Sequence, residues 1–229
     1  MKAVIVAHGQ PGDPGPQERA MADLARRIAA EAPGCDVAGA TLAMPGALKA
    51  AVRDAGLIYP MFMAEGWFTA RQLPKKLAEA GAPGLRILPP FGTDPALPGL
   101  IAARARTAAQ VEGWRPEDTT LLLSAHGSQV SQASFTITTR IAALVAPHFA
   151  RIVTGFVEQQ PFIAEAARRL TRAISLPLFA LTAEHVTGDL PAALDRAGFT
   201  GPRLAPIGAA PEVPALIAAA IRAEILNLK

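Results

Sequence analysis

One short pattern occurs twice in this chain: a run of apolar residues that ends in Ala-His-Gly. Leu121–Gly127 carries it in the second half, and Val4–Gly9 carries it near the start. Other matching pairs keep almost the same spacing: His8 and His126 are 118 residues apart, Pro74 and Pro191 are 117 apart, and Gly92 and Gly208 are 116 apart. A spacing that drifts so little along the whole chain indicates an internal duplication.

Each half alternates apolar strands with helical patterns. In the first half the pattern predicts strands near 3–7, 36–42, 57–63 and 85–88, with helices near 17–32, 45–55 and 98–111 and another beginning near 74. The second half predicts strands near 119–124, 152–157, 176–181 and 204–207. This alternation predicts an α/β fold of two similar parallel-sheet βα units, 1–113 and 114–229, which face each other across a central cleft.

Composition excludes several classes of protein. Apolar residues make up 51% of the chain and charged residues 18%, which is enough for a substantial core. The net charge is only +3 and no Lys/Arg run reaches four residues, so we expect no nucleic-acid partner. No stretch approaches the roughly 18 apolar residues of a membrane span. The lone Cys35 and the absence of a signal-peptide pattern after Met1 predict a cytoplasmic protein.

Two of the four histidines are placed for metal binding. His126 and His185 each follow an apolar strand of the same half, so their loops should open at the same edge of one sheet. Two neutral imidazoles that converge there suit Co²⁺, Ni²⁺, Fe²⁺ or Zn²⁺. The alternative is that both histidines only cap strands through backbone hydrogen bonds. His148 follows Pro147 at a helix end, and we expect it on the surface.

Taken together, the motifs resemble those of the CbiX family of sirohydrochlorin chelatases, which are related to ferrochelatase. The resemblance rests on the duplicated Ala-His-Gly, on Phe156–Pro161, and on Pro177-Leu178-Phe179 followed by Glu184-His185 and Asp189-Leu190-Pro191. It implies a chelatase fold and the insertion of a divalent metal, Co²⁺ first with Ni²⁺ or Fe²⁺ as alternatives, into sirohydrochlorin or a related tetrapyrrole. The metal is then a substrate, no nucleotide is needed, and the protein is a monomer or homodimer.

The resemblance also assigns the site. It implies that His126 and His185 bind the metal and accept the pyrrole protons, and that His8 and Glu65 contribute to the metal site from the first half. The repeat places Phe68 where the second half has His185, and Gln72 where it has Asp189. A complete histidine pair therefore occurs only in the second half, which we expect to be the working site.

A tetrapyrrole with many carboxylates calls for polar and flat apolar groups around the metal. We expect these from Ser128 and Gln129, which follow His126, and from Trp67, Phe68 and Arg71, which follow the strand predicted at 57–63. The alternative for the two aromatic residues is packing in the core. A histidine phosphatase would need an Arg before the histidine, where this chain has Ala7 and Ala125, and no nucleotide-binding glycine loop occurs. A non-catalytic tetrapyrrole- or metal-binding carrier is the alternative function.

Overall fold

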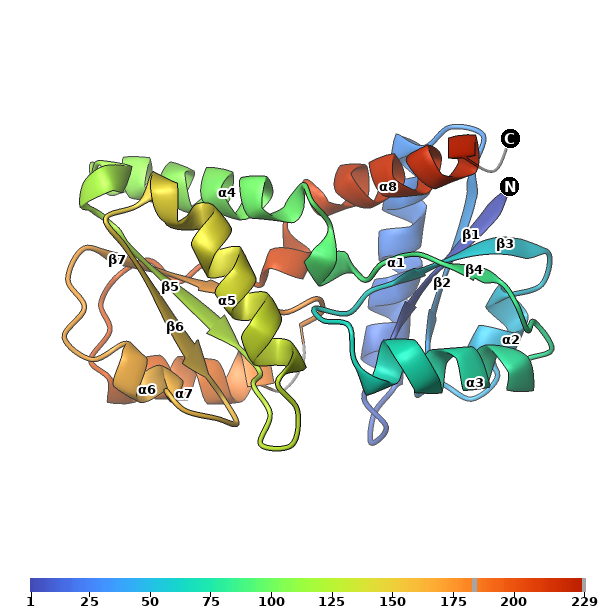
Figure 1. The fold of residues 1–229 in the computed structure, drawn as a ribbon, viewed down its shortest axis with the longest axis horizontal. Coiled ribbons are helices and arrows are strands. Elements are labelled where there is room, and N and C mark those ends of the chain that lie inside the picture. Colours follow the sequence, from blue (N-terminus) through green and yellow to red (C-terminus); the bar gives the residue numbers. More distant parts are fainter. Residues whose placement is uncertain (183–184, 228–229) are drawn as a thin grey trace. The chain divides into compact units, whose positions relative to one another are not determined.

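The computed structural model describes residues 1–182 and 185–227, and the chain divides into two compact units. Unit 1 consists of Met1–Asp94 and Pro211–Lys229, and unit 2 is the continuous segment Pro95–Ala210. Each unit has a parallel sheet with helices on both of its faces (Figure 1). The predicted α/β class and its duplicated parallel sheets are therefore confirmed, while the cleft between the halves stays a prediction.

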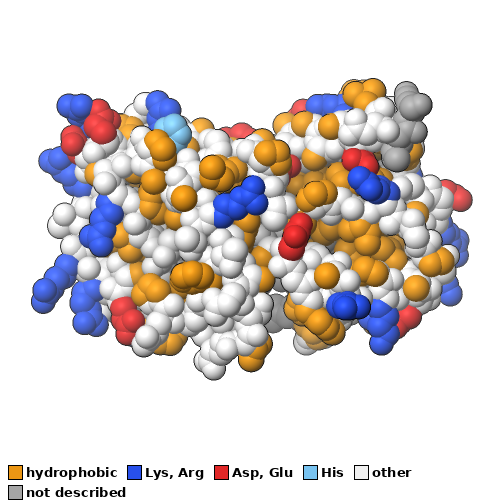
Figure 2. Space-filling model, viewed as in Figure 1, with side chains coloured by type: hydrophobic (Ala, Val, Ile, Leu, Met, Phe, Trp, Pro, Cys, Tyr) orange, Lys and Arg blue, Asp and Glu red, His pale blue; other side chains and the backbone are white. Residues whose placement is uncertain are grey.

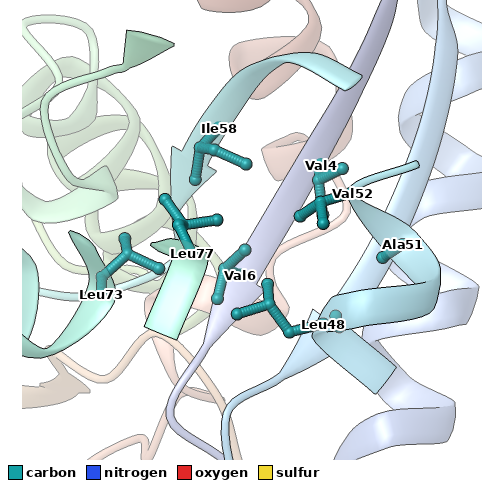
Figure 3. Close-up of a cluster of buried hydrophobic side chains, with 9 residues drawn as sticks. Val4, Val6, Leu48, Ala51, Val52, Ile58, Leu73 and Leu77 are labelled. Atoms are coloured by element: carbon teal, nitrogen blue, oxygen red, sulfur yellow. The ribbon is translucent and has the colours of Figure 1, made fainter. Parts of the chain in front are cut away.

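The sheet of unit 1 has four parallel strands in the order β2-β1-β3-β4, namely β1 (Lys2–Ala7), β2 (Asp36–Thr41), β3 (Ala55–Pro60) and β4 (Arg86–Ile87). The interior strand β1 is buried on both faces, which is why it is apolar from Ala3 to Ala7. The helices α2 (Ala47–Ala51) and α3 (Leu73–Glu79) cover one face, where Leu48, Leu73 and Leu77 pack against Val4, Val6 and Ile58 (Figure 3).

Two further helices of unit 1, α1 (Gly15–Glu31) and α8 (Val213–Asn227), pack against each other. Gly39 of β2 allows α1 to approach the opposite face of the sheet, because a Cβ there would lie 2.3 Å from the carbonyl oxygen of Met21. Arg222 of α8 donates a hydrogen bond to the carbonyl of Glu31, and Arg86 pairs with Glu224 at 2.7 Å. The last helix of the chain is thus part of unit 1.

Unit 2 repeats this plan with strands in the order β6-β5-β7, namely β5 (Thr120–Ala125), β6 (Arg151–Phe156) and β7 (Ala173–Pro177). A parallel bridge between Ser175 and Arg203 takes the place of β4. One face is covered by α6 (Ile163–Ala166) and α7 (Leu190–Arg196), packed against Leu122, and α4 (Leu97–Val111) packs with α5 (Ala133–Val145) on the other.

Short one-turn helices connect the main elements. They are η1 (Phe68–Gln72), η2 (Phe91–Thr93), η3 (Pro116–Asp118), η4 (Ala146–His148), η5 (His185–Asp189) and η6 (Ile207–Ala209). None of the described helices is long and apolar enough to cross a membrane. On the face drawn in Figure 2, Lys and Arg side chains do not merge into one continuous patch.

Several predicted element boundaries are wrong. The strand predicted at 176–181 is β7 at Ala173–Pro177, and the one predicted at 57–63 is β3, which ends at Pro60. The residue after each proline still donates one hydrogen bond to the neighbouring strand, Met61 to Val6 and Leu178 to Ser124, both at 2.7 Å, and the regular pairing stops there although apolar residues continue. The last predicted strand, 204–207, is reduced to the bridge at Arg203, and the helix predicted at 45–55 is only Ala47–Ala51.

The compact units divide the chain differently from the halves of the repeat, 1–113 and 114–229. Helix α4 belongs to the first half of the sequence and to unit 2, whereas α8 belongs to the second half and to unit 1. Each compact unit therefore receives a helix from the other half. The halves are units of sequence, and the compact units are units of packing.

Candidate metal and tetrapyrrole site

The two Ala-His-Gly loops have the same local geometry. Gly9 and Gly127 both adopt a left-handed backbone, with φ of 78° and 77°. At Gly127 a side chain would also collide with its neighbours, since a Cβ would lie 2.7 Å from Cγ of Gln159. A turn of this kind at the carboxyl end of a strand holds the preceding histidine at the edge of the sheet.

The same turns fix which ring nitrogen of each histidine is available. Nδ1 of His8 lies 2.6 Å from the carbonyl oxygen of Gly9, and Nδ1 of His126 lies 2.9 Å from that of Gly127. A carbonyl can only accept a hydrogen bond, so Nδ1 carries the proton and Nε2 keeps a lone pair for a metal or a proton. His126 thus makes a backbone hydrogen bond through Nδ1, while the alternative that both His126 and His185 only cap strands stays untested, because the side chain of His185 lies outside the described residues.

A carboxylate that sequence analysis did not assign lies beside His126. An oxygen of Glu158 is 3.6 Å from Nδ1 of His126, and both side chains are nearly half exposed, at 47% and 42%. The backbone N–H of Glu158 donates to the carbonyl of His126 at 2.9 Å, which holds the end of β6 against this loop. The sequence feature that could have pointed to Glu158 is its position just after a strand, two residues beyond the last residue of β6.

Neighbouring polar groups fasten the loop that follows His126. The N–H of Ser128 donates to Oε1 of Gln159 at 2.7 Å, and the N–H of Gly127 donates to Oγ of Ser134 at 3.1 Å. Ser128 is half-buried, whereas Gln129 is exposed. Both residues lie in the loop that begins at the histidine, and their role in substrate binding stays a prediction.

The segment that carries His185 has a counterpart in unit 1. Both η1 and η5 are five-residue π-helical turns that lead directly into α3 and α7, and they are 117 residues apart in sequence. This supports the match of Phe68 to His185 and of Gln72 to Asp189. The backbone of His185 begins η5, but its side chain, like Ala183 and Glu184, lies outside the described residues.

In unit 1, the position that matches His185 packs on a histidine. The ring centroids of His8 and Phe68 are 4.5 Å apart, in an edge-to-face arrangement. Trp67, Glu65 and Arg71 are exposed in the same region between β3 and α3. The alternative that Trp67 is a core residue is wrong, since 64% of it is exposed.

Within the described part of the chain, no three His, Cys, Asp or Glu side chains are grouped closely enough to hold a metal ion. The side chain of His185 lies outside this search, so the predicted metal site of His8, Glu65, His126 and His185 stays a prediction. His148 is exposed at the end of η4, which agrees with the surface position predicted for it.

Comparison with known proteins identifies the class. The family model CbiX matches residues 2–108 and again 120–224, one match for each half of the repeat. A solved structure described as CbiX, the terminal enzyme for biosynthesis of siroheme in denitrifying bacteria, has 58% sequence identity and a TM-score of 0.92, covering 97% of this chain and 99% of that chain. No curated protein sequence matches.

More distant structures share the fold. SirB from Bacillus subtilis, solved with Fe³⁺, has a TM-score of 0.72 at 15% identity and covers 96% of this chain and 94% of its own. DR2241 from Deinococcus radiodurans, a multi-domain protein with structural similarity to chelatases, has a TM-score of 0.69 at 23% identity and covers 96% of this chain and 54% of its own. The fold and the repeated histidine loops are thus those of a tetrapyrrole chelatase. The chain belongs to the CbiX family of sirohydrochlorin chelatases.

Proposed function

We propose that this enzyme inserts Fe²⁺ into sirohydrochlorin, and that His126, His185 and Glu158 of unit 2 hold the metal during transfer. Iron is favoured because the relative with 58% identity is described as the terminal enzyme of siroheme biosynthesis, and siroheme is an iron tetrapyrrole. Co²⁺, expected first from the resemblance alone, and Ni²⁺ are the competing metals in the test below.

The observation that carries this proposal is the duplicated geometry. In unit 1 the ring of His8 and the ring at the matching position, Phe68, are 4.5 Å apart. The same loop, strand and π-helical turn recur in unit 2 with His126 and His185. Imidazoles at these two positions can bind one divalent ion, with the exposed carboxylate of Glu158 as a third ligand.

The proposed ligands suit transfer better than storage. Insertion of a divalent metal releases two protons from the pyrrole nitrogens, and imidazole and carboxylate groups can accept them near neutral pH. The lone pair on Nε2 of His126 is directed away from its hydrogen bond at Nδ1 and can serve either role. Nitrogen and oxygen ligands without thiolates hold the metal loosely enough for the macrocycle to remove it.

The loop after His126 supplies polar groups for the peripheral carboxylates of the tetrapyrrole. Oγ of Ser128 accepts a hydrogen bond from the N–H of Val130 at 3.3 Å, so its own O–H can be donated to a carboxylate. The amide of Gln129 is exposed and offers two further donors. A contribution of His8 and Glu65 to the metal site stays a prediction.

The test is an anaerobic insertion assay with sirohydrochlorin and Fe²⁺, Co²⁺ or Ni²⁺, followed by visible absorbance. We expect sustained turnover above the spontaneous rate, fastest with Fe²⁺. His126→Ala, His185→Ala and Glu158→Gln should each lower the rate, the histidine variants by roughly 100-fold or more. His148→Ala, an exposed histidine in the same unit, is the matched control and should match the wild type. Full activity in His126→Ala, or no turnover with any metal, would contradict the proposal.

A further inference from the structure

Unit 1 has an aromatic cluster around Phe68, the position that matches His185 in the repeat. Phe68 lies at its centre, with its ring 5.2 Å from that of Trp67 at 79° and 6.2 Å from that of Phe62 at 23°. The third neighbour is His8, whose ring centroid is 4.5 Å away. Because Phe68 occupies the position of His185, unit 1 cannot form the histidine pair and presents a continuous group of rings instead.

Most of this cluster is in contact with solvent. Trp67 is 64% exposed and Phe68 is 38% exposed, although large aromatic side chains are usually buried for the most part. The turn that carries them is well tied down, since Ala70 N–H donates to the carbonyl of Gly66 at 2.8 Å and Gly66 N–H donates to Oγ1 of Thr69 at 2.9 Å. An ordered turn thus holds two large apolar rings in water, which favours a binding surface.

The charge beside the cluster indicates what it binds. Arg71 is exposed in η1, four residues after Trp67, about one turn further along the chain. An exposed aromatic ring such as that of Trp67 next to a guanidinium suits a ligand with a conjugated ring and carboxylates at its edge, because aromatic rings stack and guanidinium pairs with carboxylate. A metal-free tetrapyrrole with peripheral carboxylates has this combination.

We propose that unit 1 has exchanged the second histidine of the repeat for macrocycle binding, with the exposed ring of Trp67 stacked on the tetrapyrrole and the ring of Phe68, at 79° to it, in contact through its edge. Phe68 replaces a metal ligand by an apolar ring, and His8 packs against its edge. Arg71 pairs with a carboxylate at the rim of the macrocycle. This inference rests on the proposed function for the identity of the ligand, and it adds contacts of unit 1 with the macrocycle to those of Ser128 and Gln129.

The first experiment measures binding of metal-free sirohydrochlorin under anaerobic conditions, followed by the change in its own absorbance. Trp67→Ala should raise Kd roughly tenfold, as removal of a stacking ring typically does, whereas Trp67→Phe should retain most of the affinity. Val111→Ala is the matched control, because Val111 is an apolar residue of α4 that is 80% exposed. Its Kd should equal that of the wild type. An unchanged Kd in Trp67→Ala would overturn the proposal.

A second variant restores the histidine of the repeat. Phe68→His should weaken sirohydrochlorin binding and, with Co²⁺ alone as the probe, should add one bound ion per chain relative to the wild type. Melting temperatures of both variants check that folding is preserved. Tight tetrapyrrole binding by Phe68→His would overturn the proposal, as would a wild type that fails to bind sirohydrochlorin. A wild type that binds sirohydrochlorin but inserts no metal would refute the proposed function alone, and the Trp67 comparison would still decide this inference.

Discussion

Gly208, in η6, has no room for a side chain, and its replacement tests how tightly the segment that leads to His185 is held. A Cβ at this position would lie 1.9 Å from the carbonyl oxygen of Ala180, whereas real Cβ atoms keep at least 3.0 Å from such neighbours. The two backbone segments would have to separate by about 1 Å. The hydrogen bond from the N–H of Gly208 to the carbonyl of Phe179, 3.0 Å long, would be strained by the same movement.

These two effects set the expected cost of Gly208→Ala. Overpacking a rigid interior costs about 1–3 kcal/mol, and a buried donor or acceptor that loses its partner costs about 1–3 kcal/mol more. We therefore expect a loss of about 2–6 kcal/mol in the free energy of unfolding. For a chain of this size, that corresponds to a decrease in Tm of roughly 4–24 °C. Because Ala180 lies between β7 and His185, metal insertion should also slow.

Thermal and urea unfolding followed by circular dichroism would measure this loss. Gly99→Ala is the matched control, because Gly99 lies in α4 and a Cβ added there would have no heavy atom within 4 Å. It should leave stability unchanged or raise it by up to about 1 kcal/mol, as alanine does in helices. A Tm for Gly208→Ala within about 2 °C of the wild type would refute the argument, because the segment after β7 would then yield freely.

Three further predictions concern the interior and the division into units. Ser124 is fully buried and its hydroxyl has no hydrogen-bond partner among the described residues, whereas the repeat places Val6 at this position. Ser124→Val should therefore raise the free energy of unfolding, measured by urea titration, by about 1–2 kcal/mol. A decrease would show that the hydroxyl makes a hydrogen bond in the folded protein. Burial, with a smaller contribution from Asp94, raises the pKa of Tyr59 above its usual range. The contribution of the neutral Tyr59 to the free energy of unfolding should therefore be fully present below the unfolded pKa of about 10 and decrease as pH rises beyond it. Tyr59 is the only tyrosine, so phenolate absorbance reports it alone, and ionisation near pH 10 without unfolding would contradict its burial. Finally, the fragment 95–210 should unfold cooperatively in urea by itself, whereas 114–229, which lacks α4, should not; equal cooperativity in both would show that α4 is dispensable.

Much of the site could be predicted because strand ends are marked locally. The apolar runs before His8 and His126 required buried parallel strands, and the glycine after each histidine required a sharp turn at the edge of the sheet. The match of Phe68 to His185 followed from spacing alone, and the paired π-helical turns agree with it. Glu158 was missed as a site residue, because only the pairing of β6 beside β5 brings it within 3.6 Å of His126.

The sequence by itself determined the α/β class, the duplication and the histidine loops, since each depends on residues that are close together in the chain or repeat at a fixed spacing. Tertiary structure alone decided which helix completes each sheet. The apolar residues of α4 and α8 require that each helix be buried, but they do not specify against what, and the packing places α4 in unit 2 and α8 in unit 1. Hydrophobic burial depends on the area removed from water and has no direction, so an apolar helix face alone does not identify its partner.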